Sequence, residues 1–438
     1  MAGIIGSLCG GYECELLGRK TCLMIENAMV FCSMILGGVA PSFMYLMIGR
    51  TVHGYCYGAL IGAVPVYVNE ICQSQVRSMV GGAMGTFYCL ATASVFTLGA
   101  MLPWRWLLLV CSALPLLNLV MLIFASESPT WYVLRGRDED ALECLRKLRG
   151  NNVVAEQEYH RLTDNFKRHQ ECANEKKEIP KWRMVFDLLM EPTFRTPLLS
   201  VIALIVLGIH LSGGAPLLLY LNKIIIRTGA PGDPYWIGAA LQISRAVLSI
   251  ISSCYLQFFP KRVLCTIGMV IMTVANLVVW LSVQYDWAEI FGLEDSSVFL
   301  WMPIVGISLL YLGVASGQCH VIVCLKGELL PSFGRALGSG MLGIFDALTM
   351  FTVGKFLPSI DKAIGLGQIF LICAGICICL ILIVWLFIPE TRGMTLEEIE
   401  EHYRIKAYGP GYDKEKVSKT LDKLSQYDNM SMWGDVLK

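Results

Sequence analysis

The sequence contains little charge for its length. Of its 438 residues, 16% are Asp, Glu, Lys or Arg, against roughly 25% in an average soluble domain, and 55% are hydrophobic. The 35 basic and 35 acidic residues balance, and the basic ones form no dense cluster. A nucleic-acid-binding protein usually shows such a basic patch. The composition therefore argues against a soluble enzyme and against a nucleic-acid partner.

Catalytic signatures are also missing. The sequence has no His, Cys and Asp cluster at metal-binding spacing, no phosphate-binding loop, and no nucleophile placed beside a base. Most of the 17 cysteines lie inside apolar runs, as Cys373 and Cys377 do, which is typical of small buried hydrophobes in helices. The segment Met1 to Gly11 lacks the basic flank and cleavage site of a secretory signal. We predict no enzymatic activity, no cofactor and no metal site.

Long apolar runs dominate what is present. A helix needs roughly 20 apolar residues to cross a bilayer, and continuous runs indicate helices, since barrel strands alternate. A shorter apolar stretch, Met1 to Tyr12, reads as the last part of a helix whose beginning is absent. The ten predicted spans are Thr21 to Ala40, Phe43 to Val68, Met79 to Met101, Trp106 to Ala125, Thr196 to Leu221, Tyr235 to Phe258, Arg262 to Tyr285, Val298 to Leu325, Arg335 to Leu357 and Leu366 to Ile388.

The charges divide the chain. More than half of them lie between Ser126 and Phe194 or after Ile388, and the central segment has the composition of short surface helices, with a disordered linker as the alternative. The acidic loop Asp286 to Asp295 favours an external position, which places the central segment and the tail in the cytoplasm. The predicted domains are an incomplete amino-terminal transmembrane half (1–125), a cytoplasmic helical segment (126–194), a carboxyl-terminal transmembrane half (195–388) and a cytoplasmic tail (389–438).

Charged motifs recur at the predicted membrane edges. Glu70 and Arg77 have the same seven-residue interval as Glu328 and Arg335, which indicates an internal repeat. Glycines let helices approach closely, and the acids and bases beside them can pair across the inner face of a bundle. The other motifs are Gly-x-x-x-Glu-x-x-Gly-Arg-Lys from Gly11 to Lys20, Gly49-Arg50, Glu127-Ser128-Pro129 and Pro389-Glu390-Thr391-Arg392-Gly393.

With these five motifs in order from Gly11 to Gly393, the sequence resembles the sugar porter family of the major facilitator superfamily, especially insect facilitated trehalose transporters and animal glucose facilitators. The resemblance implies an all-α membrane protein with a twelve-helix bundle of two halves that works by alternating access. This chain supplies ten full transmembrane helices and a partial one. In this picture the charges form a cytoplasmic gate whose salt bridges hold the two halves together: Glu15, Arg19, Glu70, Arg77, Glu127, Arg262, Glu328, Arg335 and Glu390. An alternative and compatible role is to fix topology at the interface.

The resemblance also implies sites that this sequence has changed. A sugar is neutral and hydroxyl-rich, so family sites use amides and an indole. The seventh-helix pattern Gln-Gln-x-Ser-Gly-x-Asn falls on Ile209 to Ala215, which keeps Ser212 and Gly213 and loses the amides. Four other family ligands, two asparagines, a glutamine and a tryptophan, fall on Arg245, Asp346, Gly85 and Val323.

Charged residues at the bilayer centre are costly unless they are paired or hydrated. We therefore predict that Arg245 and Asp346 pair with each other, with His210 or His320 close by. Ser212 to Pro216 should break or bend its helix, because Pro216 removes a backbone hydrogen bond. The candidate substrate-cavity residues are His210, Ser212, Gly213, Arg245, His320 and Asp346.

These residues leave several functions open. The main prediction is facilitated diffusion of a hexose or disaccharide across a lipid bilayer, in a multi-pass protein of the plasma membrane. The alternatives are a carrier of a charged or other polar solute, and a membrane sensor or interaction protein that does not transport. A family member would carry a complete first helix ahead of Gly11, and we expect an incomplete gene model or a short isoform rather than a functional eleven-segment carrier.

Overall fold

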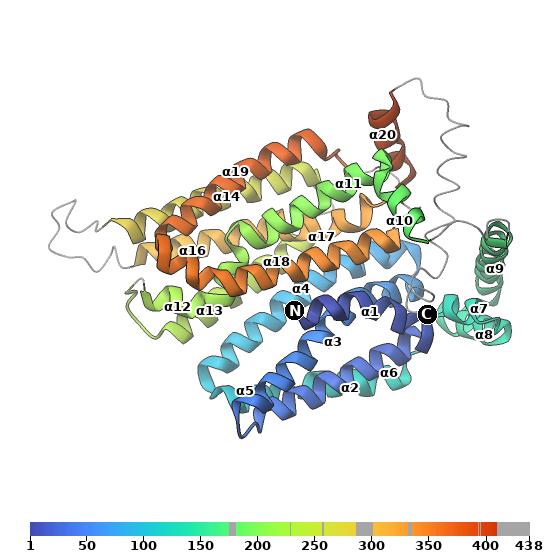
Figure 1. Ribbon diagram of the computed structural model, residues 1–438, viewed down its shortest axis with the longest axis horizontal. Helices are drawn as coiled ribbons and strands as arrows, with labels where there is room; N and C mark the ends of the chain where they lie inside the picture. Colours follow the sequence, from blue (N-terminus) through green and yellow to red (C-terminus); the bar gives the residue numbers. More distant parts are fainter. Residues whose placement is uncertain are drawn as a thin grey trace.

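The computed structural model describes residues 1–174, 181–227, 229–255, 258–285, 301–331, 335–392, 394 and 396–409. Within these ranges all regular structure is helical, and long helices run side by side along one direction to form a bundle (Figure 1). The acidic loop Asp286 to Asp295 and nearly all of the predicted tail after Tyr408 lie outside the described residues.

Helices of the bundle fall into two sets, before and after the charged central segment. The amino half contains α1 (Ala2–Leu17), α2 (Arg19–Gly38), α3 (Phe43–Ile71), α4 (Ser74–Met101), α5 (Trp104–Cys111) and α6 (Ala113–Phe124). The carboxyl half contains α11 (Pro192–Ala203), η1 (Leu204–Leu211), α12 (Gly214–Arg227), α13 (Pro234–Tyr255), α14 (Lys261–Gln284), α16 (Met302–Gly313), η3 (Val314–Gln318), α17 (Cys319–Glu328), α18 (Arg335–Ile364) and α19 (Leu366–Phe387).

Among the described residues, nine helical segments are long and apolar enough to cross a membrane. Three of these segments combine consecutive helices: α5 with α6, α11 with η1 and α12, and α16 with η3 and α17. The nine segments match nine of the ten predicted runs. The tenth run, Phe43 to Val68, lies in the 29-residue helix α3, which is not among the nine, so the count of ten stays a prediction. The apolar start of the chain is the 16-residue helix α1.

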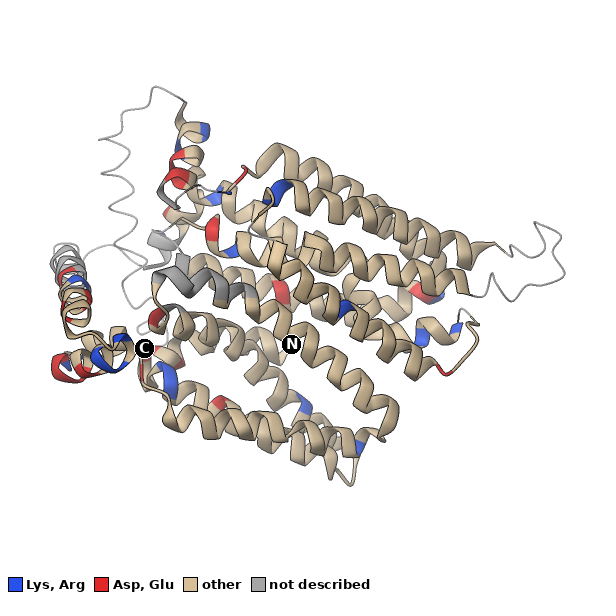
Figure 2. Cartoon of the chain, turned by 180° about the vertical axis from the view of Figure 1, so that it is seen from behind, with Lys and Arg blue, Asp and Glu red and all other residues tan. Residues whose placement is uncertain are grey.

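The central segment forms surface helices, as predicted. These are α7 (Pro129–Leu134), α8 (Asp138–Arg149), α9 (Asn152–Asn174) and α10 (Lys181–Met190), and α20 (Leu396–Tyr408) follows the last span. Helix α8 has three acids in its first turn and three bases in its last, as the helix dipole favours, and ends at Gly150 in the left-handed conformation. We call the end of the bundle that carries α7–α10 and α20 the charged end. Figure 2 shows few charged residues along the middle of the bundle.

The buried core is concentrated in the carboxyl half. Two large clusters of apolar side chains lie there, around Leu204, Met269 and Ile322 and around Met272, Tyr311 and Phe370. The amino half has a smaller cluster around Cys22 and Leu23. Helix α4 packs mainly against α13 and α17, while α1 and α3 contact α18, so these helices form the interface between the halves.

Candidate functional site

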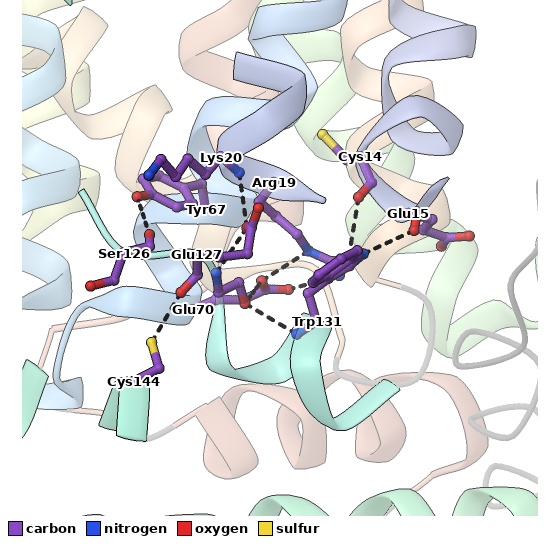
Figure 3. Close-up of polar contacts among 11 residues, drawn as sticks. Cys14, Glu15, Arg19, Lys20, Tyr67, Glu70, Ser126, Glu127, Trp131 and Cys144 are labelled. Atoms are coloured by element: carbon purple, nitrogen blue, oxygen red, sulfur yellow. Dashed lines mark hydrogen bonds and ion pairs between the residues drawn. The ribbon is translucent and has the colours of Figure 1, made fainter. Parts of the chain in front are cut away.

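The first group of polar residues lies where the amino half meets the charged end (Figure 3). The Arg19 guanidinium, at the start of α2, donates from Nε and Nη2 to the two oxygens of Glu70 at 3.0 and 3.1 Å. Ser128 also donates its hydroxyl to Glu70. A two-pronged arginine–carboxylate pair of this kind fixes geometry as well as charge. It ties α2 to the end of α3 and to the start of α7.

Glu127 completes this amino-half cluster, which comprises Arg19, Lys20, Glu70, Glu127 and Ser128. Its carboxylate accepts the backbone N–H of Lys20 at 2.9 Å and that of Ser128 at 2.8 Å. The first backbone donors of α2 lack partners within the helix, so a carboxylate here both satisfies a donor and complements the helix dipole. Gly18 is required beside it, because its φ is +99° and an added Cβ would lie 2.5 Å from a Glu127 oxygen.

The carboxyl half repeats this arrangement. Glu390 accepts the backbone N–H groups of Lys261 and Arg262, at 3.0 and 3.1 Å, at the start of α14. The Lys261 ammonium pairs with Glu328 at the end of α17, and Thr391 donates to Glu328 at 2.8 Å. We call Lys261, Arg262, Glu328, Glu390 and Thr391 the carboxyl-half cluster.

The two clusters match residue for residue. Glu390 corresponds to Glu127, Thr391 to Ser128, Glu328 to Glu70, and Lys261 with Arg262 to Arg19 with Lys20. The internal repeat predicted from Glu70 and Glu328 is therefore present in three dimensions. Arg77 and Arg335, the other members of that prediction, have side chains outside the described part of the structure.

The surface helices are fastened to the same end. The Trp131 indole donates to the backbone oxygen of Glu15 at 3.1 Å, and Arg135 donates to the same oxygen at 3.1 Å. Arg149 donates to the backbone oxygen of Ile71 at 2.8 Å. Buried in α8, the Cys144 thiol contacts the backbone oxygen of Glu127 at 3.1 Å. Burial and then the Glu127 carboxylate raise the pKa of Cys144 to about 11.

The structure describes part of the predicted gate. The ion pairs Arg19–Glu70 and Lys261–Glu328 each join helices of one half, and none crosses between the halves among the side chains that the structure describes. Arg262 forms no pair there with an acid; its guanidinium lies 4.3 Å from the centre of the Trp385 ring. The reason is geometric, because each acid ends a helix beside the start of another helix of its own half.

The helix break predicted at Ser212 to Pro216 is confirmed. Helix α11 widens into the π-helix η1, and α12 begins at Gly214 after Gly213 takes a φ of +109°. A break at membrane depth exposes backbone oxygens that need partners. Asn276 donates to the Ser212 backbone oxygen at 3.0 Å, and Gln318 in the second π-helix, η3, donates to the Gly208 backbone oxygen at 2.5 Å.

The predicted ion pair between Arg245 and Asp346 is wrong. Asp346 on α18 instead contacts the His210 ring, with His210 Nε2 and Asp346 Oδ1 2.9 Å apart. Proximity of His210 to this acid was predicted correctly. Arg245 lies on α13, and its guanidinium stands 5.8 Å from the Tyr88 ring and 5.7 Å from the Tyr311 ring. Arg245 therefore contacts two aromatic rings where a carboxylate was predicted.

His320 lies on the same side of α13 as Arg245. Its Nε2 is 2.9 Å from the hydroxyl of Ser249, one helical turn beyond Arg245. An added Cβ on Gly85 of α4 would lie 3.6 Å from the His320 ring, so this histidine sits where the two halves meet. Of the six candidate cavity residues, the structure joins His210 with Asp346, and neither of these forms an ion pair or a hydrogen bond with Arg245.

Sequence reasoning missed several polar partners. Gln242 donates to the Tyr311 hydroxyl at 3.0 Å and accepts from Arg245 at 3.4 Å. The signal for Gln242 was its position three residues before Arg245, on the same face of one helix. Tyr88 gave no such signal, because it lies on a helix of the other half. Among the described residues, no group of three or more His, Cys, Asp or Glu is placed to hold a metal ion.

Comparisons with known proteins agree with this architecture. The family model described as sugar (and other) transporter matches residues 1–403. The human solute carrier family 2, facilitated glucose transporter member 6, is 29% identical over 422 residues, which cover 91% of this chain and 81% of that protein. The facilitated trehalose transporter Tret1 of Polypedilum vanderplanki is 27% identical over 400 residues, which cover 91% of this chain and 77% of that protein.

A solved structure shows the same fold. It is that of the proton:xylose symporter XylE, of the major facilitator superfamily, bound to 6-bromo-6-deoxy-D-glucose. It superposes with a TM-score of 0.70 at 19% identity, over 92% of this chain and 87% of that chain.

Proposed function

The chain belongs to the sugar (and other) transporter family, and from this premise we propose that it is a multi-pass membrane carrier for facilitated diffusion of a hexose or a disaccharide. The observation that carries the proposal is the repeated polar cluster, one copy at the charged end of each half. A carrier built from two equivalent halves can expose a central site to either side by moving one half against the other.

The clusters support a mechanism in which each half moves as a unit. Within each half, the start of one transmembrane helix, the end of another and the segment that carries the capping glutamate are joined by charge-assisted hydrogen bonds. Between the halves, the Thr86 and Ser253 hydroxyls form a hydrogen bond of 2.7 Å. A neutral hydrogen bond contributes about 1 kcal/mol. Contacts of this size bias two conformations without locking either one.

We further propose where the parts lie. The charged end faces the cytoplasm, residues 1–125 and 195–388 form the two halves, residues 126–194 form the cytoplasmic helical segment, and residues 389–438 form the tail. The membrane is the plasma membrane. The Glu15, Arg77 and Arg335 side chains belong to the gate together with the two clusters, while His210, Ser212, Gly213, Arg245, His320 and Asp346 line the substrate path.

Flux into reconstituted vesicles tests the proposal. Purified full-length protein in proteoliposomes should take up labelled glucose or trehalose faster than protein-free vesicles, and preloaded unlabelled sugar should accelerate the uptake. Asp346→Asn should slow it, whereas Asp361→Asn, which changes an outlying pair with Arg227, serves as the matched control. Uptake equal to that of protein-free vesicles for every sugar tested contradicts a sugar carrier and favours a non-transporting protein.

A further inference from the structure

Arg245 is a buried cation without a carboxylate partner. Its exposed fraction is 6%, and within the described residues no acidic oxygen lies within 4.0 Å of it. A guanidinium has five N–H donors. The structure gives Arg245 one hydrogen bond, to Gln242 at 3.4 Å, and its Nε atom has no partner. Most of its donors are therefore free to bind something else.

Burial of such a charge is unfavourable. An unpaired ion inside a protein or a membrane loses its hydration without gaining an opposite charge in return. The Tyr88 and Tyr311 rings offset part of this cost through cation–π contacts. These rings provide no acceptor atom in the plane of the guanidinium for its remaining N–H groups. An anion with two oxygens would satisfy both the charge and the donors, because the guanidinium fork matches a carboxylate.

The groups around Arg245 suit hydroxyls. Gln242 and the Tyr311 hydroxyl lie on one side of it, and the Ser249 hydroxyl with the His320 ring lies one turn along α13. These are neutral donors and acceptors of the kind that binds sugar hydroxyls. Tyr88, which covers the guanidinium from α4 of the other half, is itself 45% exposed. A movement of α4 or of this ring would uncover the Arg245 guanidinium.

We propose that Arg245 binds the carboxylate of an acidic sugar, so that the substrate class of this carrier includes hexuronates, sugars whose sixth carbon is a carboxylate. This inference rests on the proposed function and names a substrate class for it. The carboxylate forms two hydrogen bonds with the Arg245 guanidinium between Tyr88 and Tyr311. The sugar hydroxyls then face Gln242, Ser249 and His320.

A pair of ligands that differ only in charge tests this assignment. Thermal unfolding of the purified full-length protein is followed with glucuronate, with its neutral methyl ester and with glucose, since a bound ligand raises the unfolding midpoint by mass action. Glucuronate should bind roughly tenfold or more tightly than the ester, as expected for a charge-assisted pair. Equal affinities for the acid and its ester would overturn the proposal with the unaltered protein alone.

Substitutions of Arg245 test whether this residue is responsible for the preference for glucuronate over its ester. Arg245→Gln should reduce glucuronate affinity about tenfold and leave the affinity for the ester within roughly threefold, while Arg245→Lys keeps part of the preference. Arg227→Gln, which removes a more exposed arginine of the same half, should change neither. Glucuronate binding that survives Arg245→Gln unchanged would overturn the assignment to this residue.

Flux separates this inference from the proposed function. If vesicles transport glucose while glucuronate neither binds nor competes with it, the carrier stands and the acidic-sugar inference fails. If no sugar, acidic or neutral, crosses the membrane, the proposed function fails. Glucuronate uptake that is competed by glucose and lost in Arg245→Gln supports both.

Discussion

At the scale of single residues, the contact between His210 and Asp346 is a hydrogen bond in a largely buried place. Asp346 satisfies His210 Nε2, whereas His210 Nδ1 is buried and has no partner in the described structure. Asp346→Ala would leave both nitrogens unsatisfied, at a cost of about 1 to 3 kcal/mol, and should lower the unfolding midpoint in detergent. Asp346→Asn keeps an acceptor oxygen and should lower it less.

The matched control is Asp361→Ala. It breaks the pair with Arg227, whose side chain is 55% exposed, and such pairs contribute roughly 0 to 1 kcal/mol. The two alanine variants should therefore differ. Equal midpoints for both would mean that His210 finds another partner, and that the Asp346 contact has little structural importance.

The raised pKa of Cys144 predicts that its thiol is alkylated slowly. With a pKa of about 11 instead of 9.0, this side chain holds about a hundredfold less thiolate near neutral pH. Alkylation measured by peptide mass spectrometry should be slower to that extent than at Glu143→Cys, a neighbouring and exposed position of α8. Glu127→Gln removes the negative charge that contributes to the shift, so the pKa should fall and labelling should accelerate. No acceleration would assign the shift to burial alone.

Residue identity could be predicted from the sequence better than residue pairing. Asp346 and Arg245 were recognised because charges in apolar runs are conspicuous, and Glu70 and Glu328 because their intervals repeat. Their partners could not be predicted. Which side chain meets Arg245 depends on the rotation of α13 and on the approach of α4, and these depend on the packing of helices far apart in the sequence.

At the scale of helices, two glutamates act as distant N-caps. Glu127 and Glu390 each accept backbone N–H groups at the start of a transmembrane helix, α2 and α14 respectively. Substitution with Gln keeps one acceptor oxygen but removes the charge that complements the helix dipole. Each variant should lose about 0.5 to 2 kcal/mol of stability, measured by thermal or denaturant unfolding in detergent.

The comparison that matters is between the halves. If the two clusters are equivalent, Glu127→Gln and Glu390→Gln should have losses of similar size. Glu143→Gln, which disrupts only an exposed pair with Lys147, should lose less than either. If only one of the two variants loses stability, the clusters share their geometry but contribute unequally to the stability of the protein.

Helix positions and helix breaks were predictable to different degrees. Apolar length predicted nine of the spans, and the run Ser212 to Pro216 predicted the break before α12, because glycine and proline weaken a helix locally. The second irregular turn, η3, contains Gly317 but no proline, and it was not predicted. Its partner is η1, through Gln318 and the Gly208 backbone oxygen. Because such a turn depends on contacts with a distant helix, its own residues give little indication of it in the sequence.

At the scale of the whole molecule, the described residues of the two halves meet through few polar contacts, and that interface should carry the motion. Thr86 on α4 and Ser253 on α13 hold their hydroxyls 2.7 Å apart, close enough for cysteines at both positions to form a disulfide. Oxidised Thr86→Cys/Ser253→Cys protein in vesicles should lose most of its sugar flux, and a reductant should restore it. The chain has 17 native cysteines, so each single variant under the same oxidant is the control. Flux that persists after the disulfide is confirmed by mass spectrometry would show that α4 and α13 move together, and would place the opening elsewhere in the bundle.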